Sequence, residues 1–197
     1  MSAWPLLVLS DSPAATKDVA GRLAGLCASG DVVLLSGDLG AGKTAFAQGF
    51  AAALGVEGPV TSPTFALVRQ YRCAATAPVA TLIHADVYRT GSLGEVVELA
   101  LGELVEERAI ALIEWGDLAA PALGNDALDV LLELPDAVEV EAEAEAEAEV
   151  EVEAGAGTER RIITIRGRGR WVERVDEVAG ALSHPSPEPA HADGHAT

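Results

Sequence analysis

A glycine-rich stretch in the first quarter of the 197-residue chain carries the residues best suited to holding phosphate. Residues 34–50 read LLSGDLGAGKTAFAQGF, and the part from Gly37 to Thr44 fits the pattern G-x-x-x-x-G-K-[ST]. Glycines let successive backbone N–H groups point at phosphate oxygens, and the helix expected to follow adds its positive amino-terminal end. In this pattern the lysine reaches the β and γ phosphates, and the final hydroxyl takes one position on Mg²⁺. The predicted phosphate-binding residues are Gly37, Asp38, Leu39, Gly40, Ala41, Gly42, Lys43, Thr44 and Ala45.

Two carboxylates follow apolar runs that have the character of buried strands. Asp86 ends the run LIHAD, and Glu114 follows the run ALI. A site of this kind needs a carboxylate at the end of a neighbouring strand, to hold Mg²⁺ or to polarise the attacking water. We therefore predict Lys43, Asp86 and Glu114 as catalytic residues, and Thr44, Asp86 and Glu114 as metal ligands. Which of the two carboxylates contacts the metal directly stays open at this stage.

Two further features adjoin these candidates in the sequence. Pro63 stiffens the segment TSPTF, whose hydroxyl groups at Ser62 and Thr64 could approach a γ-phosphate or its metal. Trp115 stands beside Glu114, where it either frames the nucleotide site, faces a partner or belongs to the core. We add Ser62, Thr64 and Trp115 to the predicted cofactor-binding residues.

The surrounding pattern alternates apolar strands with amphipathic helices. We expect a first helix closed by Gly30, and a second from the glycine turn to near Gly55. A further one or two short helices are expected over 91–105. Strands are expected within 31–37, 60–71, 80–89 and 109–117. This alternation predicts an α/β protein with a mainly parallel core sheet. Together with the glycine-rich motif, it indicates a P-loop NTPase three-layer sandwich.

The last third of the chain changes character. Residues 128–134 and 160–167 look like two strands of a C-terminal antiparallel pair, as a hairpin or at the sheet edge, and a final helix is expected near 171–182. Between the strands, 138–158 is an acidic insertion with eight glutamates at alternate positions. We expect a disordered surface loop there, with a docking segment for a basic partner as the alternative. The prediction is one domain over 1–183 and a disordered tail over 184–197.

Composition limits the kinds of partner. The formal charge is −18, and an acidic surface repels nucleic acid and anionic membrane, so direct binding to either is not expected. Cys27 and Cys73 have no metal or redox spacing and are expected to be buried thiols. No apolar run reaches the roughly 20 residues that span a bilayer, and the amino terminus lacks the features of a signal peptide. A cytoplasmic protein is the expectation.

Taken together, the motifs GDLGAGKT, TSPTF, HADVYR and LIEWGD, in that order, resemble the bacterial TsaE (YjeE) family. The resemblance covers about residues 14–117 and, more weakly, the later strand pair. It implies a P-loop ATPase that binds ATP and Mg²⁺ and works with TsaD-like and TsaB-like proteins. These install threonylcarbamoyl on adenosine 37 of ANN-decoding tRNAs, and the tRNA would be held mainly by the partners.

The resemblance also implies roles for residues of this sequence. Lys43 and the loop amides would hold phosphates, and Thr44 and Glu114 would ligate Mg²⁺. Asp86 would serve the metal or the attacking water. Residues 13–16 would lie near the base. The ATPase would be weak alone and would support turnover of the complex without performing the transfer. Ala45 departs from the family, which usually has a second hydroxyl there, at a cost of about 1 kcal/mol in one α-phosphate contact.

Two rival functions keep the same phosphate loop. One is a P-loop kinase for a small acceptor, with Arg69, Arg72 and Arg89 as candidate phosphate clamps. Such kinases normally need an arginine-bearing lid, and no clear lid segment is visible. The other is a binding module that is gated by nucleotide and does not hydrolyse it.

Overall fold

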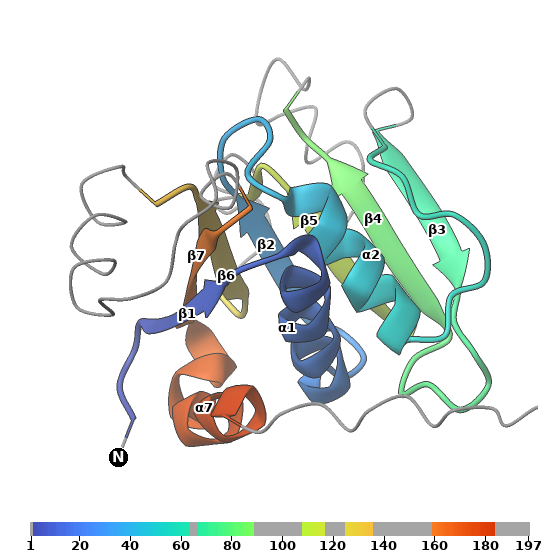
Figure 1. Ribbon diagram of the computed structural model, residues 1–197. Helices are drawn as coiled ribbons and strands as arrows, with labels where there is room; N and C mark the ends of the chain where they lie inside the picture. The colour runs from blue at the N-terminus through green and yellow to red at the C-terminus, as the bar shows by residue number, and fades with distance from the viewer. Residues whose placement is uncertain (1, 64–66, 89–107, 117–124, 136–158, 184–197) are drawn as a thin grey trace, which may run out of the picture.

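Seven strands form a single sheet in the order β1-β7-β6-β2-β5-β4-β3 (Figure 1). The computed structural model describes residues 2–63, 67–88, 108–116, 125–135 and 159–183. The strands are β1 (Leu6–Ser10), β2 (Val32–Ser36), β3 (Val68–Arg72), β4 (Thr81–Asp86), β5 (Ala109–Glu114), β6 (Leu128–Glu133) and β7 (Arg161–Gly167).

The centre of this sheet is parallel, as the sequence predicted. β2 pairs in parallel with both β5 and β6, and β5 pairs in parallel with β4. All six residues of β5 are buried, which is typical of a central parallel strand covered on both faces. Because these strands run the same way, they all end at one edge of the sheet. We call this the carboxyl edge, marked by Ser36, Asp86 and Glu114.

Antiparallel strands complete the sheet on both sides. β6 and β7 form the predicted antiparallel pair, but neither of them is an outer strand of the sheet. β1 pairs antiparallel with β7 and takes the outer position, and the sequence pattern did not predict this strand. Its sequence LLVLS has no polar alternation, and its partner lies more than 150 residues away. At the opposite side, β3 pairs antiparallel with β4.

Three α-helices are described, and two of them cover one face of the sheet. α1 (Pro13–Leu26) and α2 (Lys43–Ala53) lie side by side there (Figure 1). α1 is capped by the Ser12 side chain, which accepts the Ala15 N–H, and it ends four residues before the predicted Gly30. A 3₁₀ turn, η3 (Gly169–Arg174), precedes α7 (Val175–Ser183), in the region where the last helix was expected.

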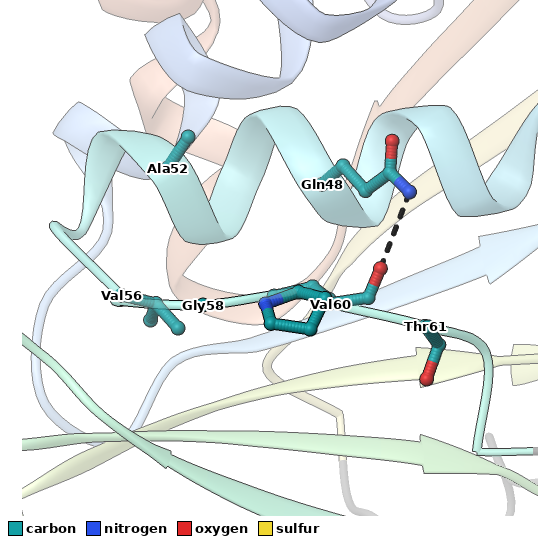
Figure 2. A pocket seen from close by; sticks show the side chains of 7 residues that line it. Gln48, Ala52, Val56, Gly58, Val60 and Thr61 are labelled. Atoms are coloured by element: carbon teal, nitrogen blue, oxygen red, sulfur yellow. Dashed lines mark hydrogen bonds between the residues drawn. The ribbon is translucent and has the colours of Figure 1, made fainter.

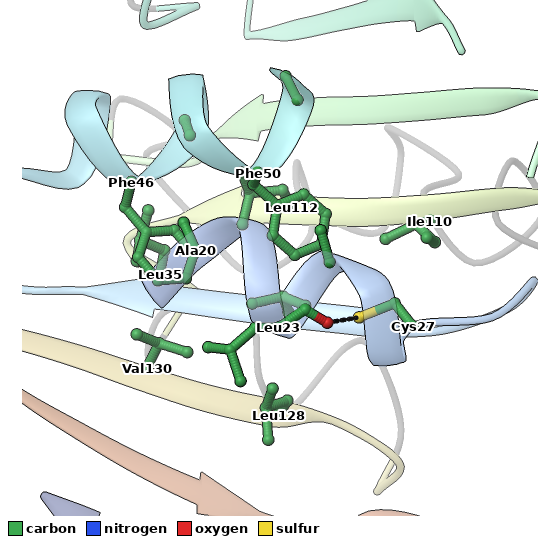
Figure 3. Packing of buried hydrophobic residues seen from close by; sticks show 14 of the residues in the cluster. Ala20, Leu23, Cys27, Leu35, Phe46, Phe50, Ile110, Leu112, Leu128 and Val130 are labelled. Atoms are coloured by element: carbon green, nitrogen blue, oxygen red, sulfur yellow. Dashed lines mark hydrogen bonds between the residues drawn. The ribbon is translucent and has the colours of Figure 1, made fainter. Parts of the chain in front are cut away.

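The main core lies between the α1 and α2 pair and the sheet. Figure 3 shows Phe46 and Phe50 of α2 and Leu23 of α1 packed over the strand residues Leu35 and Leu112. Gly49 allows the two helices to approach closely, because a Cβ at that position would overlap the backbone of Lys17. This packing fixes the amino-terminal end of α2 relative to the strand ends.

A second, smaller apolar cluster lines the other face of the sheet. It includes Ile83, Ala85, Ala111 and Ile113, and all of them are buried. The helices predicted over 91–105 lie outside the described residues. The described part therefore establishes a mixed α/β protein with a parallel-centred sheet, and the third layer stays a prediction.

Both cysteines are buried and free, as predicted. Burial raises the pKa of the Cys27 thiol far above its ordinary value, with the nearby Asp31 carboxylate acting in the same direction. None of the described helices is long and apolar enough to cross a membrane. The acidic insertion at 138–158 and the tail at 184–197 lie outside the described residues, so their predicted disorder and the single-domain boundary stay predictions.

Candidate phosphate-binding site

The glycine loop lies at the carboxyl edge, between the end of β2 and the start of α2. Gly37 has a left-handed φ of 136°, and a Cβ at this position would clash with the carbonyl oxygen of Leu132 in β6. Only glycine lets the chain leave β2 so close to its neighbour strand. α2 begins at Lys43 directly after the loop, so the N–H groups of its first turn face the same region.

Lys43 is buried, and its ammonium group is bound back onto the loop. Its Nζ donates to the carbonyl oxygens of Gly37 at 2.5 Å and Asp38 at 2.8 Å. The same nitrogen lies 4.3 Å from the ring centre of Trp115, which is a cation–π distance. The positive charge is therefore held between the loop carbonyls and the Trp115 ring.

The two predicted carboxylates lie next to each other at the ends of adjacent strands. Asp86 of β4 and Glu114 of β5 are paired in register, and Glu114 is also in register with Leu35 near the end of β2. Asp86 is 5% exposed and Glu114 is 3% exposed. Because burying an unpaired charge is costly, two buried carboxylates need a cation or hydrogen-bond donors nearby.

Each of these carboxylates has one hydrogen-bond partner that the sequence analysis did not assign. His84 Nε2 lies 2.9 Å from Glu114 Oε1, and both side chains are buried. Asp86 Oδ1 accepts the backbone N–H of Tyr88 at 3.0 Å. His84 stands two residues before Asp86, so strand alternation already places both on one face of β4. That spacing was the available signal for His84.

The TSPTF segment leads back to the same edge. β3 begins beside the end of β4, with Val68 opposite Ala85. Just before it, the Leu67 carbonyl oxygen accepts the Asp86 N–H at 2.8 Å. Ser62 is partly buried in the preceding stretch, whereas Thr64 lies outside the described residues. The described part of the segment ends at Pro63, whose carbonyl oxygen accepts the Leu67 N–H, and its role toward phosphate stays a prediction.

Trp115 contacts both the loop lysine and the core. Its backbone is left-handed, with φ of 60°, and its ring lies 4.5 Å from that of Tyr88, centre to centre. The ring is partly exposed and also packs against the smaller apolar cluster. Trp115 thus packs against the core and contacts the loop lysine, while its role toward a nucleotide stays a prediction.

Arg161 is a second residue of the site that sequence reasoning missed. It opens β7, and its guanidinium donates to the carbonyl oxygens of Ala41 and Gly40 in the loop. No local pattern connects it with the loop, since 120 residues separate Arg161 from Ala41. Only the pairing of β7 with β6, beside β2, brings the two together.

The start of α1 lies at the same edge, because Ser10 at the end of β1 is opposite Arg161. Residues 13–16, which the family resemblance placed near the base, form the first turn of α1. The Thr16 hydroxyl is buried and lies 2.7 Å from the Ser10 hydroxyl. Thr16 is thus engaged within the protein, so the more exposed residues before it remain the candidates for a base contact.

A hollow of about 270 Å³ lies along the outer side of α2 (Figure 2). Gln48 of α2 donates to the Val60 carbonyl across it at 3.2 Å, and this bond fixes the chain just before Thr61. None of its lining residues belongs to the 37–44 loop. The hollow is therefore separate from the phosphate cradle, and the hydrogen bond helps to position the TSPTF segment.

The oxygen groups at the edge fit a magnesium ion. Mg²⁺ is usually held by one or two carboxylates together with waters and substrate phosphates, and it rarely has an all-protein cage. Asp86 and Glu114 supply two such carboxylates, and Thr44 supplies a hydroxyl at the first turn of α2. Among the described residues no group of three or more His, Cys, Asp or Glu side chains forms a ready-made metal site. The donor set thus suits a metal that arrives with its phosphate ligand.

The fold and this edge define an α/β protein with a P-loop sequence between a central parallel strand and a helix, and with two acidic strand ends beside it. A family model described as "Threonylcarbamoyl adenosine biosynthesis protein TsaE" matches residues 10–150. The chain belongs to the TsaE family, which confirms the resemblance seen in its motifs.

Individual relatives agree with this assignment. Proteins named "tRNA threonylcarbamoyladenosine biosynthesis protein TsaE" are 44% identical in Mycobacterium bovis over 124 residues and 38% identical in Bacillus subtilis over 122 residues. The matches cover 60% and 62% of this chain, and 73% of each relative. The crystal structure of Bacillus subtilis YdiB superimposes with a TM-score of 0.65 and 27% identity, over 93% of this chain and 97% of that one.

Proposed function

We propose that this protein is an Mg²⁺-dependent ATP-binding and ATP-hydrolysing component of tRNA threonylcarbamoyladenosine biosynthesis. One observation carries the proposal: the buried pair Asp86 and Glu114 lies in register at the sheet edge where the glycine loop holds the Lys43 ammonium. Family membership supplies the pathway, since the relatives are named for it. The loop and carboxylates supply the chemistry.

Each residue has a defined task in this proposal. The loop amides and Lys43 bind the phosphates, and Lys43 exchanges its bonds to Gly37 and Asp38 for phosphate oxygens. Thr44 and the two carboxylates would hold Mg²⁺, which would supply positive charge to neutralise the charge that develops on the phosphate oxygens. Glu114 is kept in place by His84, and a carboxylate fixed in this way can also orient a water for attack.

The partners follow from the family and from charge. We propose TsaD-like and TsaB-like proteins as the partners, with the tRNA held mainly by them. The ATPase supports turnover of the complex and does not perform the transfer of the threonylcarbamoyl group. A formal charge of −18 supports this division, because a protein this acidic is poorly suited to holding RNA by itself. A cytoplasmic location belongs to the same proposal.

The geometry disfavours one of the three arginines that the kinase alternative needs. Arg72 is opposite Thr81 at the start of β4, and Asp86 is at the other end of that strand. Arg72 therefore lies away from the carboxyl edge and is poorly placed to clamp phosphates there. Arg69 is opposite His84 on the edge strand, and Arg89 lies outside the described residues.

Reconstitution with matched TsaD-like and TsaB-like proteins, tRNA, ATP and Mg²⁺ tests the proposal. We expect wild-type protein to sustain threonylcarbamoyl formation over many turnovers, with ATP consumed. The Glu114→Gln variant should bind ATP and lose hydrolysis, and Lys43→Ala should lose ATP binding. ATP binding without any support of the modification would contradict the assignment to this pathway. If Glu114→Gln bound ATP without hydrolysing it and still supported threonylcarbamoyl formation fully, the protein would be a nucleotide-gated module and not an ATPase.

A further inference from the structure

Arg161 binds the phosphate loop from the side of β7. Its Nε donates to the Ala41 carbonyl oxygen at 2.9 Å, and its Nη2 donates to the Gly40 carbonyl oxygen at 3.2 Å. Two nitrogens of one planar group therefore hold two consecutive carbonyls. Arginine suits this contact, because its fork of donors is rigid and loses little freedom when it binds.

These two bonds control the direction of a loop amide. The Ala41 carbonyl and the Gly42 N–H belong to one planar trans peptide and point in opposite directions. When Arg161 holds the carbonyl on the β7 side, the Gly42 N–H is directed away from β7. The loop needs such a restraint, because Gly40 and Gly42 have left-handed φ angles of 86° and 108° and glycines are the most mobile residues when unrestrained.

We propose that Arg161 is a positioning residue for the phosphate loop, holding its amide groups ready for a polyphosphate before any ligand binds. This inference rests on the proposed function, which requires the loop to bind nucleotide phosphates. Arg161 contacts carbonyl oxygens, and its effect reaches the ligand through the loop. It should therefore act equally on any ligand that shares the diphosphate group, whatever else that ligand carries.

The test compares Arg161→Gln with Arg166→Gln. Arg166 lies on the same strand, is exposed, and makes no loop contact among the described residues, so the two variants lose the same charge. Binding of ATP, ADP and inorganic pyrophosphate is measured by calorimetry, together with the melting temperature of ligand-free protein. From the usual strength of hydrogen bonds to charged groups, we expect Arg161→Gln to weaken the binding of all three ligands by about 10- to 100-fold. Arg166→Gln should bind the three ligands as tightly as wild type does. The melting temperatures of Arg161→Gln and Arg166→Gln should be similar.

Two further measurements distinguish loss of the two-pronged contact from loss of charge or of nucleotide binding. Arg161→Lys retains the charge but not the two-pronged contact, so it should bind more weakly than wild type. Equal binding by Arg161→Lys and wild type, or by Arg161→Gln and Arg166→Gln, would overturn the inference. Amide hydrogen exchange at Gly42 in ligand-free protein should be faster in Arg161→Lys than in wild type. This exchange readout needs no nucleotide, so failure of wild type to bind ATP would refute the proposed function and leave the Arg161 result standing.

Discussion

At the scale of single residues, the pair His84 and Glu114 has the strongest consequence for the site. Both side chains are buried and 2.9 Å apart, and His84 Nδ1 has no hydrogen-bond partner among the described residues. In the proposed function Glu114 ligates a metal and needs a fixed orientation, and the imidazole hydrogen bond on one of its oxygens restricts that orientation. Residues that orient metal ligands in this way commonly matter nearly as much as the ligands themselves.

We expect His84→Leu to destabilise the protein by about 1–3 kcal/mol, because it leaves the buried Glu114 carboxylate without its partner. The same change should raise the Mg²⁺ concentration needed for ATP turnover. Denaturant unfolding and a magnesium titration of the reconstituted complex measure the two effects. His84→Gln is the matched control, since its amide N–H can still donate to Glu114. If His84→Leu and His84→Gln gave the same magnesium dependence, the hydrogen bond would have no part in orienting Glu114.

At the scale of elements, the contact between α1 and α2 fixes the helix that begins at the phosphate loop. Phe46 and Phe50 fill the space between α2 and the sheet, and Gly49 faces the backbone of Lys17 in α1. Because well-packed interiors do not absorb added volume, this face leaves no room for a methyl group. The position of the loop therefore depends on the contact between Gly49 and Lys17, which both lie at least 12 positions from Gly37 in the sequence.

Gly49→Ala should lower stability by about 1–3 kcal/mol through overpacking, despite the better helix propensity of alanine. Gly25→Ala in α1 is the control, because an added Cβ at Gly25 has no atom within 4 Å. Helix propensity alone predicts that this control is neutral or stabilises by up to about 1 kcal/mol. Chemical denaturation of both variants checks the sign. Stabilisation of both would mean that the helices separate at no cost.

At the scale of the whole molecule, the charge balance limits what this surface can hold. The chain has 13 Lys and Arg residues against 31 Asp and Glu residues. Several arginines are already engaged with carboxylates inside the protein: Arg22 with Asp18, Arg168 with Asp129, Arg170 with Asp31 and Arg174 with Glu177. The basic residues outside these pairs are far outnumbered by the remaining carboxylates, which disfavours contact with a phosphate backbone.

The isolated protein should therefore not retard tRNA in a gel-shift experiment near physiological salt. Lowering the salt should produce no binding either, since weaker screening strengthens repulsion between two polyanions. The experiment is done with the full chain, so the glutamate-rich segment is included. Tight binding that weakens as salt rises would contradict the proposal that partners hold the tRNA.

Local sequence was enough to locate much of the candidate site. The loop from Gly37 to Thr44, Asp86 and Glu114 were predicted from motif and strand ends, and all of them lie at one sheet edge. Their roles toward ATP and Mg²⁺ stay predictions. The strand β1 and the residue Arg161 were not found, because each depends on a partner far away in the chain. No residue-by-residue pattern records such a pairing.

The phosphate loop, the parallel strands around it and the family could all be predicted from the chain alone, because they follow from short motifs and from hydrophobic runs of strand length. The side chains that contact and orient the loop and its carboxylates are apparent only in the folded protein. His84 and Arg161 reach the site through strand register and sheet order, in which contacts depend on distance in space and not on spacing in the chain. A motif can name the residues that bind a ligand, whereas packing selects the residues that hold them in place.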